Sequence, residues 1–222
     1  MRRLFQFAAA LLVLTVAPGA PAQIHLKRDK PAVDDLSWLW QYTQPAPVGN
    51  GSALLSDVRL KPLLSSYLSA PQTFWGNGMN LPDTVMAFLG QPRSVISDRN
   101  RYFIATGCVA QFCPERGMLW IDLAAAHPLL VFAATNWVAE DKPTDQAGAT
   151  YTLWVFASRA LDPAHLPEAL TRNIAPWVQE PLADKTVEHI ANVILVDPDG
   201  QPHQIQPADV GIMQTTEQKA NS

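Results

Sequence analysis

The chain has 222 residues, of which 48% are hydrophobic and 16% charged, with 19 Pro and two Cys. This composition excludes a disordered chain, a collagen and a coiled coil, and the length suits about one domain that buries its own core. The formal net charge is −4 and the basic residues are spread thinly, which argues against a basic nucleic-acid-binding protein.

The first 22 residues have the parts of a cleavable export signal. Arg2 and Arg3 give a basic start, residues 4–16 form an apolar run, and Ala-Pro-Ala at 20–22 is a small-x-small cleavage site. The run is too short to span a bilayer, and no Cys near the cut offers a site for a bacterial-type lipid anchor. We expect a periplasmic or secreted protein without a stable membrane anchor. Cleavage leaves 14 basic against 20 acidic residues.

Four segments are expected along the chain. They are a signal peptide over residues 1–22, an N-terminal extension or linker over 23–52, one α+β domain over 53–212, and a polar tail over 213–222. Within the extension, residues 34–42 favour a short helix with an acidic cap. Its two Trp either dock on the domain or form an aromatic platform for a ligand.

The domain combines helical patterns with strand patterns. Apolar residues recur at spacings of three and four over 54–68 and predict one or two helices, and further helices are expected over 81–89 and 162–180. Strand patterns cover residues 94–96, 101–106, 118–123, 129–135 and 150–157, followed by a closing hairpin over 193–205. These patterns predict an α+β fold, an antiparallel sheet of about five strands with helices packed on one face.

The motifs of common enzyme classes are missing. The chain contains no GxSxG, HExxH or GxGxxG motif and no P-loop. Its five His are far apart, so no metal site is expected, and the turn over residues 197–200 lacks the Glu of a calcium loop. No nucleophile stands beside a base, and we expect neither catalytic residues nor a cofactor.

The most informative segment is residues 107–114, Gly-Cys-Val-Ala-Gln-Phe-Cys-Pro. Cys108 and Cys113 are the only cysteines and lie between two expected strands of an exported protein, so we predict a disulfide that closes a hairpin loop. So small a loop contributes about 2 kcal/mol by the chain-entropy estimate, so its stronger effect is local rigidity. A rigid loop loses less entropy on entering a partner's cleft, but a trimmed hairpin with no role remains equally open.

Further anchors flank the loop within about residues 55–135. They are Leu81, Pro82, Asp83, Thr84, Val85, Pro92, Val95, Tyr102, Arg116 and Trp120. With the two Cys, their order and spacing resemble the family of periplasmic inhibitors of vertebrate (c-type) lysozyme. In that family an α/β domain presents the disulfide loop as a wedge that plugs the active-site cleft of the lysozyme. The resemblance implies a partner-binding loop made of Val109, Ala110, Gln111 and Phe112.

The loop departs from the family pattern at its centre. The family has Lys-Pro-His-Asp, whose His pairs with the catalytic carboxylates of the lysozyme, and Gln111 stands at the position of that His. Gln111 keeps an N–H donor without a charge, and charge-assisted hydrogen bonds are about twice as strong as neutral ones. Phe112 replaces an acid by a large apolar group, which fits a sugar subsite or the anchor for a different partner.

The sequence therefore predicts an exported binding protein that is not an enzyme and whose partner is a protein. The leading hypothesis is inhibition of a lysozyme or another peptidoglycan-cleaving enzyme through the Cys108–Cys113 loop, and the acidic charge suits a basic lysozyme. The alternative is an envelope scaffold or interaction module with the same fold and no lysozyme inhibition. A hydrolase would need a pocket of clustered titratable residues that the sequence does not display.

Overall fold

The computed structural model describes residues 35–76, 78–124, 127–138, 142–143, 149–181 and 188–213. The expected signal peptide and almost all of the expected tail lie outside these ranges. The helices are η1 (Ser37–Thr43), α1 (Gly51–Leu55), α2 (Leu60–Tyr67), α3 (Leu81–Phe88), α4 (Glu168–Gln179) and η2 (Pro207–Val210). The strands are β1 (Gln91–Asp98), β2 (Tyr102–Val109), β3 (Phe112–Asp122), β4 (Leu129–Trp137), β5 (Thr150–Ala157), β6 (His189–Val196) and β7 (Pro202–Ile205). Within the described ranges, no helix combines the length and the apolar composition that a membrane span requires.

The strands form one seven-stranded sheet whose spatial order equals the chain order, from β1 at one edge to β7 at the other. All neighbours are antiparallel except β5 and β6, which are parallel. The cause is α4, because a helix that crosses back over the sheet returns the chain to run in the same direction as before. The α+β class is confirmed. The prediction of about five strands, all antiparallel, is wrong because the closing hairpin joins the same sheet behind this crossover.

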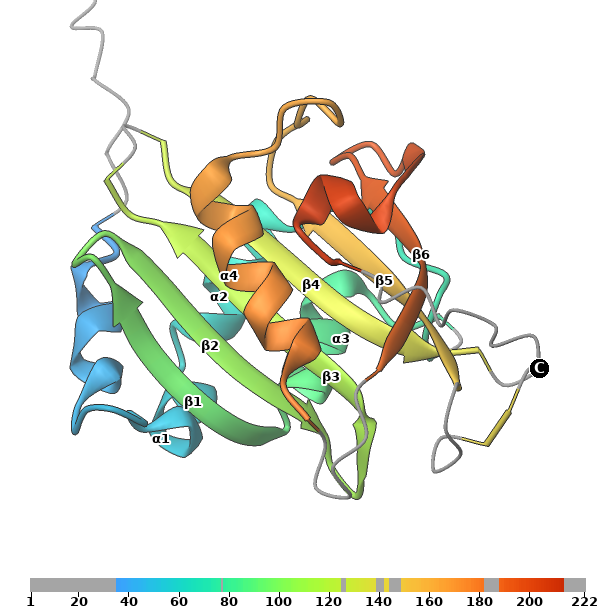
Figure 1. The fold of residues 1–222 in the computed structure, drawn as a ribbon. Coiled ribbons are helices and arrows are strands. Elements are labelled where there is room, and N and C mark those ends of the chain that lie inside the picture. The colour runs from blue at the N-terminus through green and yellow to red at the C-terminus, as the bar shows by residue number, and fades with distance from the viewer. Residues whose placement is uncertain are drawn as a thin grey trace, which may run out of the picture. The chain divides into compact units, whose positions relative to one another are not determined.

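Helices cover both faces of the sheet, so the prediction that they pack on one face is wrong. Figure 1 shows α4 in front of the sheet and α2 and α3 behind it. Phe103 and Phe132 belong to the core on the α2 and α3 side, whereas Trp120 and Val131 belong to the core on the α4 side. In β3 every residue from Glu115 to the strand's end is buried, and such strands need cover on both faces.

Caps and prolines explain where two of the helices begin. The Asn80 side chain accepts a hydrogen bond from the backbone N–H of Asp83 at 2.9 Å, and Pro82 lies in the first turn, so α3 begins as expected. The helix expected from residue 162 begins only at Glu168. Pro167 at its N-cap has ψ at 123°, outside the helical range, and a proline is best tolerated before a helix or in its first turn.

The described part of the N-terminal extension docks on the domain. The expected short helix is the 3₁₀ helix η1, and its Trp40 ring meets the Phe103 ring edge-on at 6.4 Å between centroids. Trp38 packs against the same core, with the Arg59 guanidinium 4.3 Å from the centre of its ring. Of the two alternatives for these tryptophans, the structure has the docked one.

Candidate functional site

The only two cysteines are joined, as predicted. Cys108 and Cys113 form a disulfide across Cα atoms 4.8 Å apart. Cys108 near the end of β2 is fully buried, and Cys113 near the start of β3 is half-buried. Their sulfurs lie 3.8 Å from the backbone oxygen and 3.6 Å from the side-chain oxygen of Gln91, the first residue of β1. The disulfide thus closes the hairpin and packs its base against the neighbouring strand.

The four residues expected to bind a partner form the hairpin tip, residues 109–112. Val109 and Phe112 are the last cross-strand pair, so only Ala110 and Gln111 lie beyond the ladder. Both are exposed, and Gln111 has a left-handed backbone with φ at 66°. Val109 packs against the core, while Phe112 is 37% exposed and its ring lies 6.3 Å from that of Trp137. The tip therefore combines a two-residue apex with an aromatic edge.

A register shift lies at the base of the hairpin tip. Cys108 pairs with Arg116 whereas Val109 pairs with Phe112, so β3 carries extra residues between these pairs. An irregularity of this kind bends a strand and re-aims its side chains. Glu115 is the last of these extra residues and Arg116 resumes the pairing, and both are buried. Because successive residues of a strand point to opposite faces, each reaches a different helical layer.

Arg116 ties β3 to the C-terminal end of α4. Its guanidinium donates to both carboxylate oxygens of Glu188, at 3.0 and 2.7 Å, and both side chains have 0% exposure. It also donates to the backbone oxygens of Trp177, Val178 and Glu180. Carbonyls at a helix end lack partners within the helix, and a cation there also suits the helix dipole. Burial raises the pKa of Glu188, and the charge of the Arg116 guanidinium opposes that rise.

Glu115 has only neutral partners on the opposite face. Its carboxylate accepts hydrogen bonds from the indole N–H of Trp75 and, at 2.8 Å, from the side-chain amide of Asn136. Glu115 is 7% exposed, and burial raises its pKa more than the bonds from Trp75, Asn136 and the Trp137 backbone lower it. Trp75 precedes α3 and Asn136 lies on β4, so this carboxylate joins three segments beneath the hairpin tip.

Two glycines allow α3 to reach the base of the hairpin. Gly107 and Gly117 pair across β2 and β3. A Cβ at Gly107 would lie 2.8 Å from the Cα of Leu89, and one at Gly117 would lie 2.7 Å from the Cβ of Phe88. Any larger residue would push the end of α3 away. The base of the tip is thus supported by β1, by α3 on one face and by α4 on the other.

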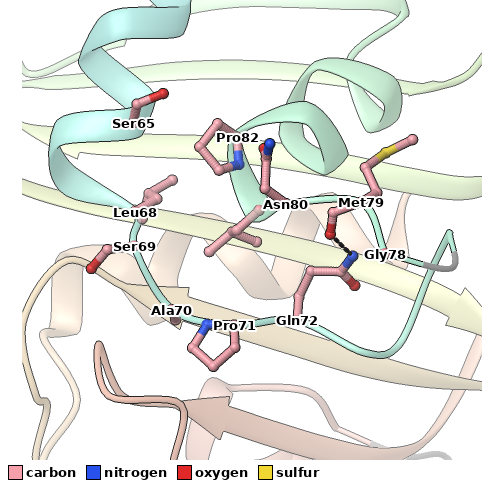
Figure 2. A pocket seen from close by; sticks show the side chains of 11 residues that line it. Ser65, Leu68, Ser69, Ala70, Pro71, Gln72, Gly78, Met79, Asn80 and Pro82 are labelled. Carbon is pink, nitrogen blue, oxygen red and sulfur yellow. Dashed lines mark hydrogen bonds between the residues drawn. The ribbon is translucent and has the colours of Figure 1, made fainter.

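A cavity of about 490 Å³ lies beside α2 and α3 (Figure 2), and none of residues 109–112 lines it. Leu68 follows α2 and Pro82 lies in the first turn of α3, and the side-chain amide of Gln72 donates to the backbone oxygen of Met79 at 2.6 Å. None of the eleven described residues that line it has an ionisable side chain. The cavity offers apolar surface, hydroxyl and amide side chains, and backbone groups.

Sequence reasoning missed the neighbours that complete the hairpin tip. Trp137 could have been found, since an aromatic residue two positions after the strand pattern of 129–135 is placed to contact a partner on a neighbouring strand. Gln91 and Glu188 had no signal, because each meets its partner only through the sheet pairing. In the described part of the chain, no group of three or more His, Cys, Asp or Glu is placed to hold a metal ion.

Comparisons with known proteins add nothing to the evidence for a function that this geometry provides. No family model, no curated protein and no solved structure matches the chain. The functional argument therefore depends on the hairpin tip and on the resemblance carried by residues 55–135.

Proposed function

We propose that the protein is an exported inhibitor of a lysozyme or another peptidoglycan-cleaving glycoside hydrolase, and that the hairpin tip enters the cleft of that enzyme. The observation that carries the proposal is the exposed apex of Ala110 and Gln111, closed by a disulfide directly behind it. The sequence resemblance supplies the class of target.

The support beneath the hairpin tip favours insertion into a rigid cleft. A segment that is already ordered pays little conformational entropy when it binds, so more of its contact energy appears as affinity. Cys108 is fully buried, and Glu115 and Arg116 hold the base of the tip to both helical layers. The apex can therefore enter a cleft without reorganising the strands behind it.

The chemistry of the apex suits the carboxylates of a glycoside hydrolase. Such enzymes place two acidic side chains beside the scissile bond. Gln111 offers an amide N–H that can donate to one of them, and its left-handed backbone sets it at the turn of the hairpin. Phe112 and Trp137 form an aromatic edge beside it, which fits an apolar sugar subsite.

Long-range charge supports encounter with a basic enzyme. The whole chain carries a net charge of −4, and the four residues of the tip carry none. The acidic body steers a cationic partner, while the neutral apex avoids burying an unpaired charge in the cleft.

The test is an inhibition assay with purified chain lacking residues 1–22. A panel of c-type and g-type lysozymes and bacterial lytic enzymes digests peptidoglycan with and without a micromolar excess of the protein. We expect inhibition of at least one class, and weaker inhibition by Gln111→Ala. Gln201→Ala is the matched control, because Gln201 is exposed in the turn between β6 and β7. Failure to slow every enzyme in the panel contradicts the proposal.

A second candidate function is an envelope scaffold or interaction module. The observation that favours it is Phe112, the only exposed aromatic side chain among the described residues, whose ring is tilted by 56° to that of Trp137 at the hairpin's side. An aromatic pair of this kind also anchors flat protein interfaces. A pull-down from envelope extract separates the two, because inhibition predicts capture of a hydrolase and scaffolding predicts a structural or secretion component.

A further inference from the structure

A second pocket, of about 380 Å³, lies at the end of the β2–β3 hairpin opposite the tip, where Tyr102 pairs with Asp122. We call it the arginine pocket, because it is lined by Arg99, Arg101, Arg159 and Arg172 around the stacked rings of Tyr102 and Trp120. The chain has ten Arg and a net charge of −4, so a pocket with four guanidinium groups is unusually basic for this chain. Its volume is at the lower end of small-ligand sites, which span about 300–1,000 Å³.

Two of these arginines are already paired and form the walls. Arg101 donates to both carboxylate oxygens of Asp122, at 2.9 and 2.7 Å. Arg172 lies 3.2 Å from the carboxylate of Asp98. The two bonds from Arg101 fix the plane of its guanidinium, and the single bond from Arg172 holds its group near Asp98. The positions of the paired arginines are therefore set before any ligand arrives.

The other two arginines have donors to spare. Arg159 is exposed and has no hydrogen bond or ion pair with any residue in the described ranges. Arg99 has a side chain that is 69% exposed, and its Nε is 4.0 Å from Asp98, a distance too long for a hydrogen bond. Asp122 and Glu168 are the acids of the lining, so the lining has two more positive than negative charges.

Neutral groups also surround the pocket. Trp120 is 1% exposed and its indole Nε1 is fully buried, so its ring supplies a wall of the pocket. Pro167, Glu168 and Ala169 bring in the N-terminal end of α4, which has no side-chain cap. The first N–H groups of a helix have no partner within the helix and favour an anion.

We propose that the arginine pocket binds a phosphate group, free or as a monoester, with Arg99 and Arg159 as its cationic ligands and the first turn of α4 as the source of neutral donors. A tetrahedral phosphate presents several acceptor oxygens in different directions, which suits donors that come from α4 and two loops. Guanidinium forks match phosphate oxygens with two parallel hydrogen bonds. Glu168 opposes binding and limits its strength. Free phosphate and a small phosphorylated sugar share this chemistry.

The arginine pocket is separate from the hairpin tip. The eight residues of β2 lie between them, which is about 26 Å of strand at about 3.3 Å per residue. Binding in the pocket neither requires nor blocks insertion of the tip. The pocket can therefore fail its test while inhibition of a hydrolase stands, and the reverse also holds.

Calorimetric titration of the full chain tests the proposal. The probes are inorganic phosphate, pyrophosphate and glucose 1-phosphate at constant ionic strength, with citrate as a carboxylate of similar charge. We expect one saturable site for at least one phosphate probe and weaker binding of citrate. Preference for glucose 1-phosphate assigns a sugar phosphate as the ligand, whereas equal binding of inorganic phosphate assigns the free ion.

Charge-matched variants locate the site. Arg159→Gln and Arg99→Gln should each weaken phosphate binding about tenfold, and Glu168→Gln should strengthen it. Arg93→Gln is the control, since it removes the same charge from a half-buried arginine that is paired with Glu180 and lies outside the pocket. In an amide NMR spectrum, the indole N–H signal of Trp120, assigned with Trp120→Phe, should shift on titration. The proposal is overturned if none of the phosphate probes binds saturably. It is also overturned if Arg93→Gln weakens phosphate binding as much as Arg99→Gln and Arg159→Gln do.

Discussion

The two ends of the β2–β3 hairpin use charge in opposite ways. At the tip the exposed residues are neutral, and the charges of Glu115 and Arg116 are buried beneath them. At the arginine pocket the guanidinium groups of Arg99 and Arg159 are exposed. Buried charges that are fully hydrogen-bonded fix a shape, whereas exposed ones remain free to meet an anion. The same pair of strands thus has a rigid, neutral tip at one end and exposed positive charge at the other.

β3 has one acidic residue in its first half, Glu115, and one at its end, Asp122. The pKa values of these two residues are shifted in opposite directions. Glu115 meets only neutral donors, so burial dominates and its pKa is raised. Burial alone would raise the pKa of Asp122 as well, but the bonds from Arg101 and the Ala124 backbone outweigh it and the pKa is lowered. A carboxylate buried without a cation holds neighbouring segments together at an electrostatic cost, whereas one with a guanidinium does not.

The largest effect is expected from removing Arg116. Arg116→Met leaves the Glu188 carboxylate buried without its cation and leaves three carbonyls at the end of α4 without their donor. We expect the free energy of unfolding to fall by about 3–5 kcal/mol, as for other broken buried pairs. Urea unfolding followed by circular dichroism measures it.

Arg101→Met is the matched control at the other end of the hairpin. Its side chain is 48% exposed, so loss of its pair with Asp122 should cost about 0–1 kcal/mol. Equal costs for the two variants would show that the tip is not the more rigidly held end. The double variant Arg116→Met with Glu188→Leu should recover part of the loss, because no unpaired charge then remains.

Removing the disulfide separates the rigidity of the tip from the stability of the fold. Cys108→Ser with Cys113→Ser should lower the free energy of unfolding by about 2 kcal/mol, the chain-entropy estimate for a short loop. Inhibition of the target hydrolase should weaken more than tenfold at a temperature where the variant is folded, because the freed tip must be ordered on binding. A variant that inhibits as well as the parent protein would contradict a role for preorganisation.

Phe112→Ala tests the aromatic edge. If Phe112 is an anchor, binding of the target should weaken by about 2 kcal/mol, while the thermal unfolding midpoint changes little because the side chain is 37% exposed. Val109→Ala is the comparison within the tip, since Val109 packs against the core and should lose stability instead. Equal loss of binding and stability in Phe112→Ala would place that ring in the core.

The sequence predicted local features best where a single residue type controls the outcome. Asn80 and Pro82 defined the start of α3, and the closely spaced Cys108 and Cys113 defined the closed hairpin. The second helical layer was missed, although the uninterrupted apolar run in β4 is typical of a strand covered on both faces. The parallel placement of β6 was missed because it depends on the path of α4, which no local pattern encodes.

The candidate site was predicted only in part for the same reason. The family resemblance implied residues 109–112 as the partner-binding loop, and these residues form the hairpin tip. The contacts that hold the tip, from Arg116 to Glu188 and from Glu115 to Trp75, join residues 72 and 40 positions apart. Pairing over such distances follows from the order of the strands and the helical layers, which the sequence patterns left undetermined.

The smallest expected effect is a difference in pH dependence between Glu115 and Asp122. The raised pKa of Glu115 means that its contribution to stability is present below its unfolded value of 4.5 and is lost as pH rises through the folded value. The lowered pKa of Asp122 means that its contribution is present above 3.8 and is lost as pH falls through the folded value. Relative to the parent protein, Glu115→Gln should therefore gain stability as pH rises, and Asp122→Asn should lose it.

Urea unfolding from about pH 3 to about pH 7 measures both differences. Any hydrogen bond that Glu115→Gln forms less well with Trp75 or Asn136 shifts the whole curve and leaves its slope unchanged, so the slope isolates the ionisation. Parallel curves for the two variants would mean that their carboxylates have the same electrostatic surroundings. Slopes of opposite sign would show that one strand holds its two acids by different means, burial at the rigid end and ion pairing at the end that faces the arginine pocket.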